Sequence, residues 1–478
     1  MPLRSVSAQQ VKRLLGSTEF ATPVYRDLAD RLRLLIVDGR LTDGSRLPSE
    51  RDFAHLLRLS RSTVTSAYVR LRELGYLHTR QGSGNYVSLP ERQRTNTQLP
   101  GGERDESGAI SFAYASGPAL PGLAGAYRAA TERLPSLLAG HGYYPDGIEE
   151  LREALAEWYT QRGLTTTADQ LVITAGALSA LNIVAQTVLS PGDRALVESP
   201  SYPNALDVLR QRARPVPYPL SPTGWEPRDF ELTLRQSAPR LSYLIPDFHN
   251  PTAAWMSEEI RPEVAAALRR YRSTAVIDET LVELSLEDEP MRTPLAAYLP
   301  DAITIGSASK AFWGGLRIGW IRAPRPLVRP LLETRALLDI GTAPFEQLVL
   351  AELLADSQAF LTAQRERLRI QRDRLLAELA AALPGWTADS PAGGLSLWVT
   401  LPDESSTRLA ALAERHHLVL TAGPRFFTDG GGERQLRLPY TAEPEVLADA
   451  VQRLAALWAD LDSSGHGRPR SAALGLTA

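Results

Sequence analysis

Three residues that could do chemistry follow short apolar runs, at points where strands are expected to end. Gly176 comes just after the first run, Asp278 lies at the carboxyl end of the second, and Lys310 follows the third. The runs are LVIT (171–174), AVIDE (275–279) and AITIGS (302–307). Ligands of open α/β sheets bind at the carboxyl ends of strands, so we expect these three residues to share one crevice.

Each of the three residues meets a different chemical demand. A glycine between a strand and a helix offers backbone N–H groups and a positive helix end to a phosphate. A carboxylate leaving an apolar strand requires a cation, such as a protonated ring nitrogen. A lysine amine can form a Schiff base, which the permanently charged guanidinium of arginine cannot. Together these are the demands of pyridoxal 5′-phosphate.

The alternatives are that Gly176 serves only helix–strand packing and that Lys310 is a surface lysine that occurs there by chance. The composition weighs against the second alternative. Of the 52 basic residues only Lys12 and Lys310 are lysines, so this chain uses arginine wherever a cation suffices. A lysine after Ser307-Ala-Ser309 is therefore the strongest single indication of nitrogen chemistry.

Length and composition exclude several classes of protein. A chain of 478 residues with 44% hydrophobic residues predicts two to four folded units rather than disorder. The absence of cysteine excludes disulfides, thiolate metal sites and cysteine nucleophiles, and the seven scattered histidines predict no metal site. No apolar run is long enough for a membrane span and no signal peptide is evident, so we expect a soluble cytoplasmic protein.

Charge and composition divide the chain into four segments. Residues 1–89 hold 14 basic and 8 acidic residues, whereas the rest of the chain holds 38 basic and 47 acidic residues. An excess of positive charge confined to the N-terminal segment is typical of a head that binds nucleic acid. We predict a head at 20–89, a flexible linker at 90–109, an α/β body at 110–462 and a disordered tail at 463–478. Within the body, we expect a large part at about 140–335 and a small part at about 340–462.

The head has the pattern of a winged helix-turn-helix. Three amphipathic helices are expected, the second capped by Ser49 with Asp52 completing a capping box. The third should turn inward Val64, Ala67, Tyr68, Leu71 and Leu74. A wing of two short strands follows. The third helix of such a fold enters the major groove, which makes the following residues DNA-binding candidates: Arg51, Ser60, Arg61, Ser62, Thr63, Arg80, Gln81 and Gly82. The alternative for any single arginine is a solvated helix face.

The head motif LPSER…LSRSTVTSAYVRLRELGYLHTRQGSG resembles the GntR family of bacterial regulators. Residues 110–462 resemble a fold-type I, aspartate-aminotransferase-like domain that binds pyridoxal phosphate. The fusion of the two resembles the MocR subfamily of transcriptional regulators. The resemblance implies a cytoplasmic regulator that binds paired half-sites in double-stranded DNA as a head-to-tail homodimer and responds to pyridoxal phosphate, alone or with an amino acid or amine.

The resemblance also assigns roles to residues of this chain. Lys310 would form the Schiff base, Asp278 would hold the ring nitrogen, Asn250 the 3′-oxygen, and Tyr202 would stack on the ring. Arg437 would grip a ligand carboxylate. The phosphate would be bound by Ser307, Ser309, Arg317 and the backbone of Ala175, Gly176 and Ala177. Core packing for Tyr202 and a structural ion pair for Arg437 are the alternatives.

The chain departs from close relatives at two places. Thr280 stands where they carry a tyrosine near the 3′-oxygen, which leaves transamination open. The turn HNPTAAW lacks their glycine after Thr252, so its conformation could differ. The segment GYYPDGIEELR resembles the region that reaches the partner subunit, and either Tyr143 or Tyr144 could take that role.

Three functions are therefore compared. The leading hypothesis is a transcription factor that senses pyridoxal phosphate. The second is a working aminotransferase fused to a DNA-binding head. The third, a DNA-binding protein with an inactive dimerisation scaffold, is disfavoured because the lysine, the aspartate and both arginines of the site are retained.

Overall fold

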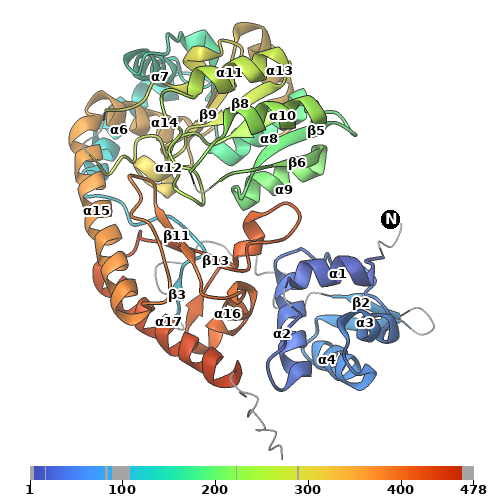
Figure 1. The fold of residues 1–478 in the computed structure, drawn as a ribbon. Coiled ribbons are helices and arrows are strands. Elements are labelled where there is room, and N and C mark those ends of the chain that lie inside the picture. Colours follow the sequence, from blue (N-terminus) through green and yellow to red (C-terminus); the bar gives the residue numbers. More distant parts are fainter. Residues whose placement is uncertain are drawn as a thin grey trace, which may run out of the picture.

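The computed structural model describes residues 5–16, 18–80, 84–88, 108–221, 223–287 and 290–465. Three bodies of structure are evident in Figure 1: the head at the N-terminus, a large part built around a central sheet, and a small part between the two. The expected linker falls on residues outside this description, apart from Gly108 and Ala109.

The head contains the three expected helices and the expected hairpin, which confirms the winged helix-turn-helix. Its elements are α1 (Ala8–Leu15), α2 (Val24–Val37), α3 (Glu50–Leu57), α4 (Arg61–Glu73), β1 (Leu77–Arg80) and β2 (Gly84–Val87). Helix α1 was not predicted. Its Val11 and Leu15 are fully buried in the same apolar cluster as the other helices, so the head's core begins before residue 20.

Local details of the head differ slightly from expectation. Ser49 caps α3 by accepting a hydrogen bond from the Asp52 backbone N–H at 3.2 Å. The Asp52 carboxylate accepts from the Ser49 hydroxyl and not from its backbone N–H, so the box is incomplete. Leu74, predicted to face inward, is 42% exposed because α4 ends at Glu73 and Leu74 is its C-cap.

The large part is organised by a seven-stranded sheet of order β4-β10-β9-β8-β7-β5-β6. Only β10 runs antiparallel to its neighbours. The strands are β4 (Leu171–Thr174), β5 (Arg194–Ser199), β6 (Arg214–Pro219), β7 (Leu241–Leu244), β8 (Thr274–Asp278), β9 (Ile303–Ser307) and β10 (Gly319–Arg322). The three apolar runs of the sequence are thus β4, β8 and β9, and the carboxyl ends of β8 and β9 lie side by side.

Helices cover both faces of this sheet. One apolar cluster holds side chains of α6, α7, α10, α11 and α14, and a second holds those of α8, α9 and α13. The bounds are α6 (Leu123–Leu138), α7 (Glu149–Gln161), α8 (Ala177–Val188), α9 (Pro203–Arg212), α10 (Pro227–Ser237), α11 (Arg261–Arg270), α12 (Ala308–Ala311), α13 (Arg325–Arg335) and α14 (Pro344–Ala355). Burial on both faces explains why the strands read as continuous apolar runs.

The small part draws on both ends of the body. Its elements are β3 (Ile110–Ser111), α15 (Ser357–Ala382), β11 (Ser396–Thr400), α16 (Ser406–Leu412), β12 (Leu418–Val419), β13 (Gln435–Pro439) and α17 (Pro444–Gly465). Strand β3 pairs with β12, and Ile110 and Phe112 are buried in this part's core, although the sequence analysis assigned only about 340–462 to it. Helix α17 also includes the first three residues of the expected tail.

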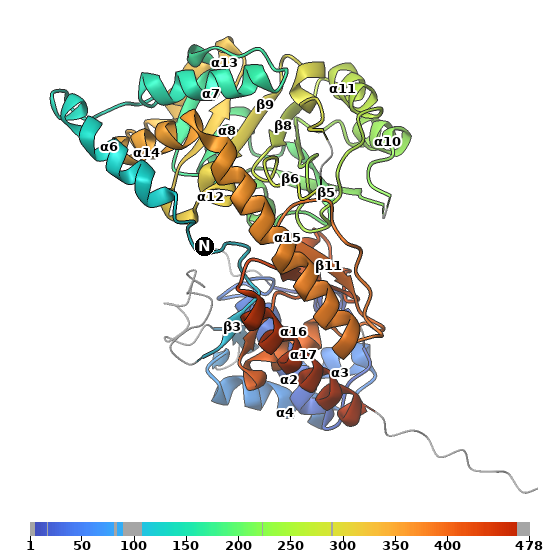
Figure 2. The same ribbon diagram turned by 90° about the vertical axis from the view of Figure 1, so that its left-hand side faces the viewer.

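Short 3₁₀ helices complete the fold: η1 (Ala168–Gln170), η2 (Leu295–Tyr298), η3 (Gly314–Leu316), η4 (Ala413–His416) and η5 (Gly423–Phe426). The long helix α15 connects the two parts of the body, as Figure 2 shows. Its Phe360 and Leu361 are buried in the core of the large part, whereas Leu368, Leu375 and Leu379 are buried in that of the small part.

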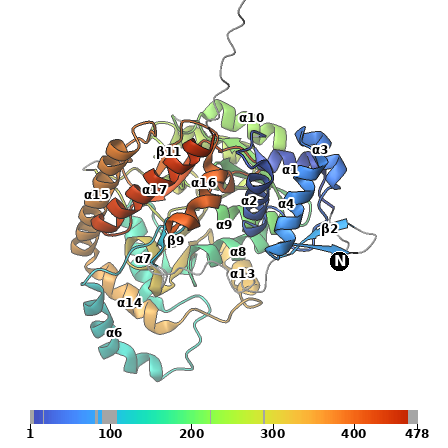
Figure 3. The same ribbon diagram turned by 90° about the horizontal axis from the view of Figure 1, so that it is seen from below.

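The head is docked on the small part through α2, which lies beside α16 (Figure 3). Arg33 Nη2 donates to the carbonyl of Ala411 at 3.1 Å, and its Nη1 lies 3.4 Å from Glu414 Oε2. Arg415 lies 3.5 Å from Asp30. A third pair, Arg408 with Asp27 at 3.8 Å, is largely buried, and Leu34 of α2 packs against the core of the small part, so the interface combines polar and apolar contacts.

Candidate functional site

A cavity of about 1190 Å³ lies where the large part, the small part and the head meet. Its walls include every residue of the body whose side chain was predicted from the sequence to bind the cofactor or a ligand carboxylate. From the large part these are Tyr202, Asn250, Asp278, Ser307, Ser309, Lys310 and Arg317, and from the small part Arg437. The predicted convergence of Gly176, Asp278 and Lys310 is therefore what the structure contains.

Lys310 lies in α12, directly after β9, with its amine inside the cavity. The amine donates a hydrogen bond to the carbonyl of Ala115 at 2.7 Å. Burial first, and then the guanidinium groups of Arg437 and Arg317, lower the pKa of Lys310 to about 8. Because burial disfavours the ammonium form, the neutral, nucleophilic amine is more populated near neutral pH than in an ordinary lysine.

Asp278 is buried at the end of β8. Its carboxylate accepts hydrogen bonds from the Tyr243 hydroxyl at 2.6 Å and from the Thr280 backbone N–H at 2.9 Å. Burial raises the pKa of this carboxyl group, although the hydrogen bonds oppose the change. A cation in the cavity would restore the charged form, which is the electrostatic demand expected of a group that faces a ring nitrogen.

The predicted phosphate cradle lies at the N-terminus of α8. Gly176 is the N-cap with φ 98°, a left-handed conformation that favours glycine. A Cβ atom there would lie 2.8 Å from Arg317 Nη2, so glycine also leaves room for the guanidinium. Arg317 itself donates to the carbonyl of Ala175 at 2.9 Å. The Arg317 guanidinium therefore lies at the N-terminus of α8, and both contribute positive charge to an anion site.

Arg437 and Asn250 form the side of the cavity next to the small part. Arg437 Nη2 donates to the carbonyl of Ala113 at 2.6 Å, and Nη1 donates to Asn250 Oδ1 at 3.4 Å. Its guanidinium lies over the Phe426 ring, 5.1 Å from the centroid. Burial lowers the pKa of Arg437 to about 10, which still leaves it charged at neutral pH. No described carboxylate pairs with it, which disfavours the structural ion-pair interpretation.

Several polar atoms here lack partners within the described chain, and their chemistry fits pyridoxal phosphate with an amino-acid ligand. Ser309 Oγ and Arg437 Nε are buried without a hydrogen bond. Phosphate and carboxylate oxygens would satisfy both. Tyr202 lies in the cavity wall, and burial raises the pKa of its hydroxyl, so it presents a neutral aromatic ring. The residues present therefore fit the cofactor.

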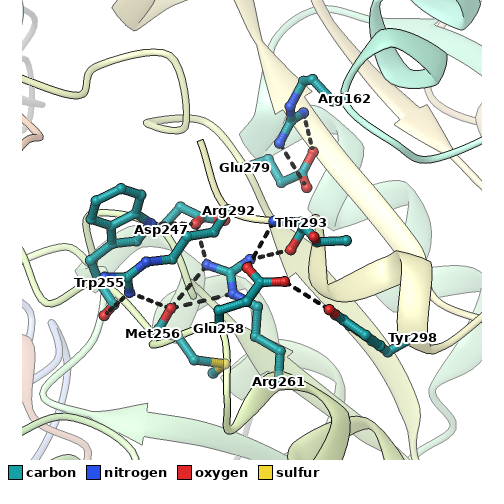
Figure 4. A network of polar contacts seen from close by, with 10 residues as sticks. All are labelled: Arg162, Asp247, Trp255, Met256, Glu258, Arg261, Glu279, Arg292, Thr293 and Tyr298. Carbon is teal, nitrogen blue, oxygen red and sulfur yellow. Dashed lines mark hydrogen bonds and ion pairs between the residues drawn. The ribbon is translucent and has the colours of Figure 1, made fainter. Parts of the chain in front are cut away.

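A buried polar network behind the cavity fixes the segment that carries Asn250 (Figure 4). Asp247 Oδ1 accepts from Arg261 Nη2 at 2.5 Å and from Trp255 Nε1 at 2.9 Å. Arg292 lies over the Trp255 ring, 3.8 Å from its centroid, and donates to the backbone carbonyl of Met256. The network holds both ends of the turn 247–256.

The turn after Thr252 contains a residue in a left-handed conformation. Ala253 has φ 57°, which is strained for a residue with a Cβ atom. Its N–H donates to the His249 carbonyl at 2.5 Å.

The DNA-binding candidates lie at two neighbouring helix N-termini of the head. Arg51 on α3 is 85% exposed in its side chain, and Arg61 and Ser62 are exposed on α4. Ser60 caps α4 by accepting from the Thr63 N–H at 3.0 Å, so its oxygen is already engaged. Arg80 ends β1, and Gln81 and Gly82 lie outside the described residues.

Sequence reasoning missed two groups of cavity residues. Tyr243, the partner of Asp278, lies on the adjacent strand β7 inside an ordinary apolar run, and only strand order reveals it. Four residues of the head, at the end of α2, also line the cavity: Arg33, Leu34, Val37 and Asp38. No local pattern in the sequence indicates that the head reaches this site.

Within the described residues, no cluster of histidine, aspartate or glutamate could hold a metal ion. The described helices likewise include none that is long and apolar enough to cross a membrane.

Comparisons with known proteins agree with this architecture. Residues 24–87 match the family of bacterial regulatory proteins called gntR, and residues 138–454 match aminotransferase class I and II. A helix-turn-helix domain of the gntR family implies DNA binding.

Full-length relatives share both segments. An uncharacterised HTH-type transcriptional regulator of Bacillus subtilis, YisV, is 27% identical over 88% of this chain and 92% of its own. The probable rhizopine catabolism regulatory protein MocR of Rhizobium meliloti is 26% identical over 93% and 95%. The crystal structure of LysN, an α-aminoadipate aminotransferase of Thermus thermophilus complexed with N-(5′-phosphopyridoxyl)-L-leucine, superposes with a TM-score of 0.67 at 28% identity, covering 74% of this chain and 93% of that one.

The buried network predicts that the replacement of two arginines on α11 has unequal effects on the stability of the protein. Replacing Arg261 by alanine should lower the free energy of unfolding by about 3–5 kcal/mol, because Asp247 would remain buried without its cation. Arg270→Ala is the matched control. It removes an exposed pair with Glu231 and should cost about 0–1 kcal/mol. Denaturant unfolding of both variants measures the difference, and equal losses would contradict the role given to the network.

Proposed function

The chain belongs to the aminotransferase class I and II family and is a GntR-type regulator fused to an aminotransferase-like domain, and from this premise we propose that it senses pyridoxal phosphate. The observation that carries the proposal is the buried Lys310 amine, in one cavity with the Gly176–Arg317 cradle and the Asp278 carboxylate. The solved LysN structure supports it, since that relative holds a phosphopyridoxyl amino acid.

When bound, pyridoxal phosphate supplies an aldehyde that reacts reversibly with amines and a ring that withdraws electrons. The residues of this chain provide the rest. The α8 N-terminus and Arg317 would bind the phosphate, and Asp278, oriented by Tyr243, would keep a proton on the ring nitrogen. Asn250 would contact the ring's 3′-oxygen, and Tyr202 would pack on the ring. Because the pKa of Lys310 is lowered, its amine would be available to hold the cofactor through its aldehyde.

We further propose that an amino compound is the second ligand. The Arg437 guanidinium faces the same cavity and lacks a described carboxylate partner, so it would bind a ligand carboxylate by a bidentate contact. Ligand binding can shift DNA affinity only if the ligand binds two arrangements of the body unequally. The contact between α2 and the small part would transmit a change in the arrangement of the body to the head.

A homodimer is proposed from large apolar side chains that are exposed on two segments of the large part. They are Leu138, Tyr143, Leu337, Leu338 and Ile340, whose exposed fractions range from 46% to 85%. Tyr144 packs against the core of the large part, whereas Tyr143 is exposed, so we assign the reach into a partner's site to Tyr143. A dimer would present two heads to paired DNA half-sites.

An aminotransferase is the second candidate function, favoured by the cofactor-facing residues other than Thr280 and by the aminotransferase relatives. Thr280 is the residue that favours the sensor over the enzyme, because by resemblance to the family it stands in place of a tyrosine near the cofactor's 3′-oxygen. Mixing the cofactor-loaded protein with a panel of amino acids and a keto acid decides between them. Sustained keto-acid turnover favours the enzyme, and ligand-dependent DNA binding without turnover favours the sensor.

The two lysines of the chain allow a direct test of cofactor binding. After incubation with pyridoxal phosphate and removal of the excess, the wild-type protein should retain a visible absorption band, and Lys310→Ala should lose it. Lys12→Ala is the matched control, because Lys12 lies in α1 and donates only to the Leu56 carbonyl at 3.5 Å. A band retained by Lys310→Ala, or absent from wild type, would refute the proposal.

The lowered pKa of Lys310 predicts the pH dependence of cofactor capture. The neutral amine is the reactive form, so the rate should rise with pH and level off above about 8 instead of near the ordinary value of 10.5. Stopped-flow absorbance measures the rate, with Nα-acetyl-lysine run in parallel to account for titration of the aldehyde itself. A protein profile that coincides with that of the model amine would show that burial does not activate Lys310.

The exposed arginines of the head predict a change in the salt dependence of DNA binding. Replacing Arg61 by alanine should weaken binding to a random-sequence duplex and reduce the slope of log K against log salt by about 1. Arg329→Ala on α13 removes an exposed arginine from the body and should leave the slope unchanged. Fluorescence anisotropy at several salt concentrations measures both, and identical slopes would remove Arg61 from the DNA interface.

A further inference from the structure

The cavity that holds Lys310 extends to the head. Its lining continues from the cofactor-facing residues past Leu418, Leu420 and Thr421 of the small part to Leu34, Val37 and Asp38 of α2. The end next to the head, which we call the distal end, is therefore walled by two domains. A ligand attached at the Lys310 end and long enough to fill the cavity would touch the head directly.

Asp38 is the unusual group of the distal end. It is the C-cap of α2, where the helix dipole disfavours a negative charge. No described residue forms a hydrogen bond or a close ion pair with its carboxylate. Burial raises the pKa of Asp38 to about 6, although Arg425 and Arg40 are near enough to oppose the change. A carboxylate in this setting is stabilised by any cation that enters the cavity.

The other charges that line the distal end are already paired. Arg425 forms an ion pair with Asp207 through its guanidinium. Glu414 lies 3.4 Å from Arg33 across the interface between head and body. The remaining lining of this end is largely apolar, with Leu34, Val37, Leu418 and Leu420. Asp38 is thus the charged group left to recognise a ligand, and the chemistry it selects is a cationic nitrogen at the end of an aliphatic chain.

We propose that the distal end is a ligand subsite in which Asp38 of the head binds the second, distal ammonium group of a diamino compound. The inference rests on the proposed function, because the first amino group of that compound would be held at the cofactor end. It assigns to the head a part in ligand selection besides DNA binding, and it makes Asp38 a specificity-determining residue.

Matched amino acids test the proposal on the full-length, cofactor-loaded protein. L-Ornithine and L-norvaline have the same carbon chain and differ in the distal ammonium group. Titrations followed by the visible band should give an affinity about tenfold higher for ornithine, as expected for a charged hydrogen bond in a partly buried site. Asp38→Asn should remove this preference and leave norvaline binding unchanged. Asp429→Asn, an exposed aspartate outside the cavity lining, should retain it.

A second readout follows the head itself. Hydrogen exchange in peptides covering α2 should change on addition of ornithine to wild type, and less so with norvaline or with Asp38→Asn. If the cofactor is retained but the two amino acids bind equally, or Asp38→Asn keeps the preference, the inference is overturned and the proposed function stands. If wild type retains no cofactor, the proposed function fails and the inference fails with it.

Discussion

Lys310 and Asp278 line one cavity without an ion pair between them, the aspartate buried and the lysine partly buried, and the contacts around them have to stabilise each group separately. The amine is bound by a backbone carbonyl, and the carboxylate by a tyrosine hydroxyl and a backbone N–H. Neither partner neutralises a charge. The cavity is therefore electrostatically incomplete, and a ligand that carries both an anion and a ring cation would complete it. The buried Arg261–Asp247 pair keeps the nearby turn rigid while the site remains unsatisfied.

The segment from Leu418 to Phe426 relates this cavity to the head. Its Phe426 ring lies under the Arg437 guanidinium, while Arg425 and Leu420 line the end of the cavity that α2 closes. Helix α15 is buried in the cores of both parts of the body and so couples the small part to the large part. The head is attached to the small part by exposed ion pairs, by the largely buried Arg408–Asp27 pair and by the packing of Leu34. The head and the cavity therefore share the small part as a common support.

Much of the fold and site could be predicted because its signals are local. The runs before Gly176, Asp278 and Lys310 are β4, β8 and β9, and strand ends converge by the geometry of an α/β sheet. Tyr243 could not be predicted, because a tyrosine in an apolar strand indicates packing until the strand order is known. Asp38 could not be predicted either, since its place in the cavity depends on how two domains dock. Leu74 was placed inside because the helical period was extended one residue beyond the end of α4.

The scarcity of lysine also has a consequence for chemical selectivity. Free aldehydes form adducts with any accessible side-chain amine, and most proteins present dozens of them. This chain presents Lys12 and Lys310, and every other basic side chain that it carries is an inert guanidinium. An aldehyde in the cell would thus meet a molecule with almost no adventitious targets, so occupancy of the buried amine would report the aldehyde concentration with little background.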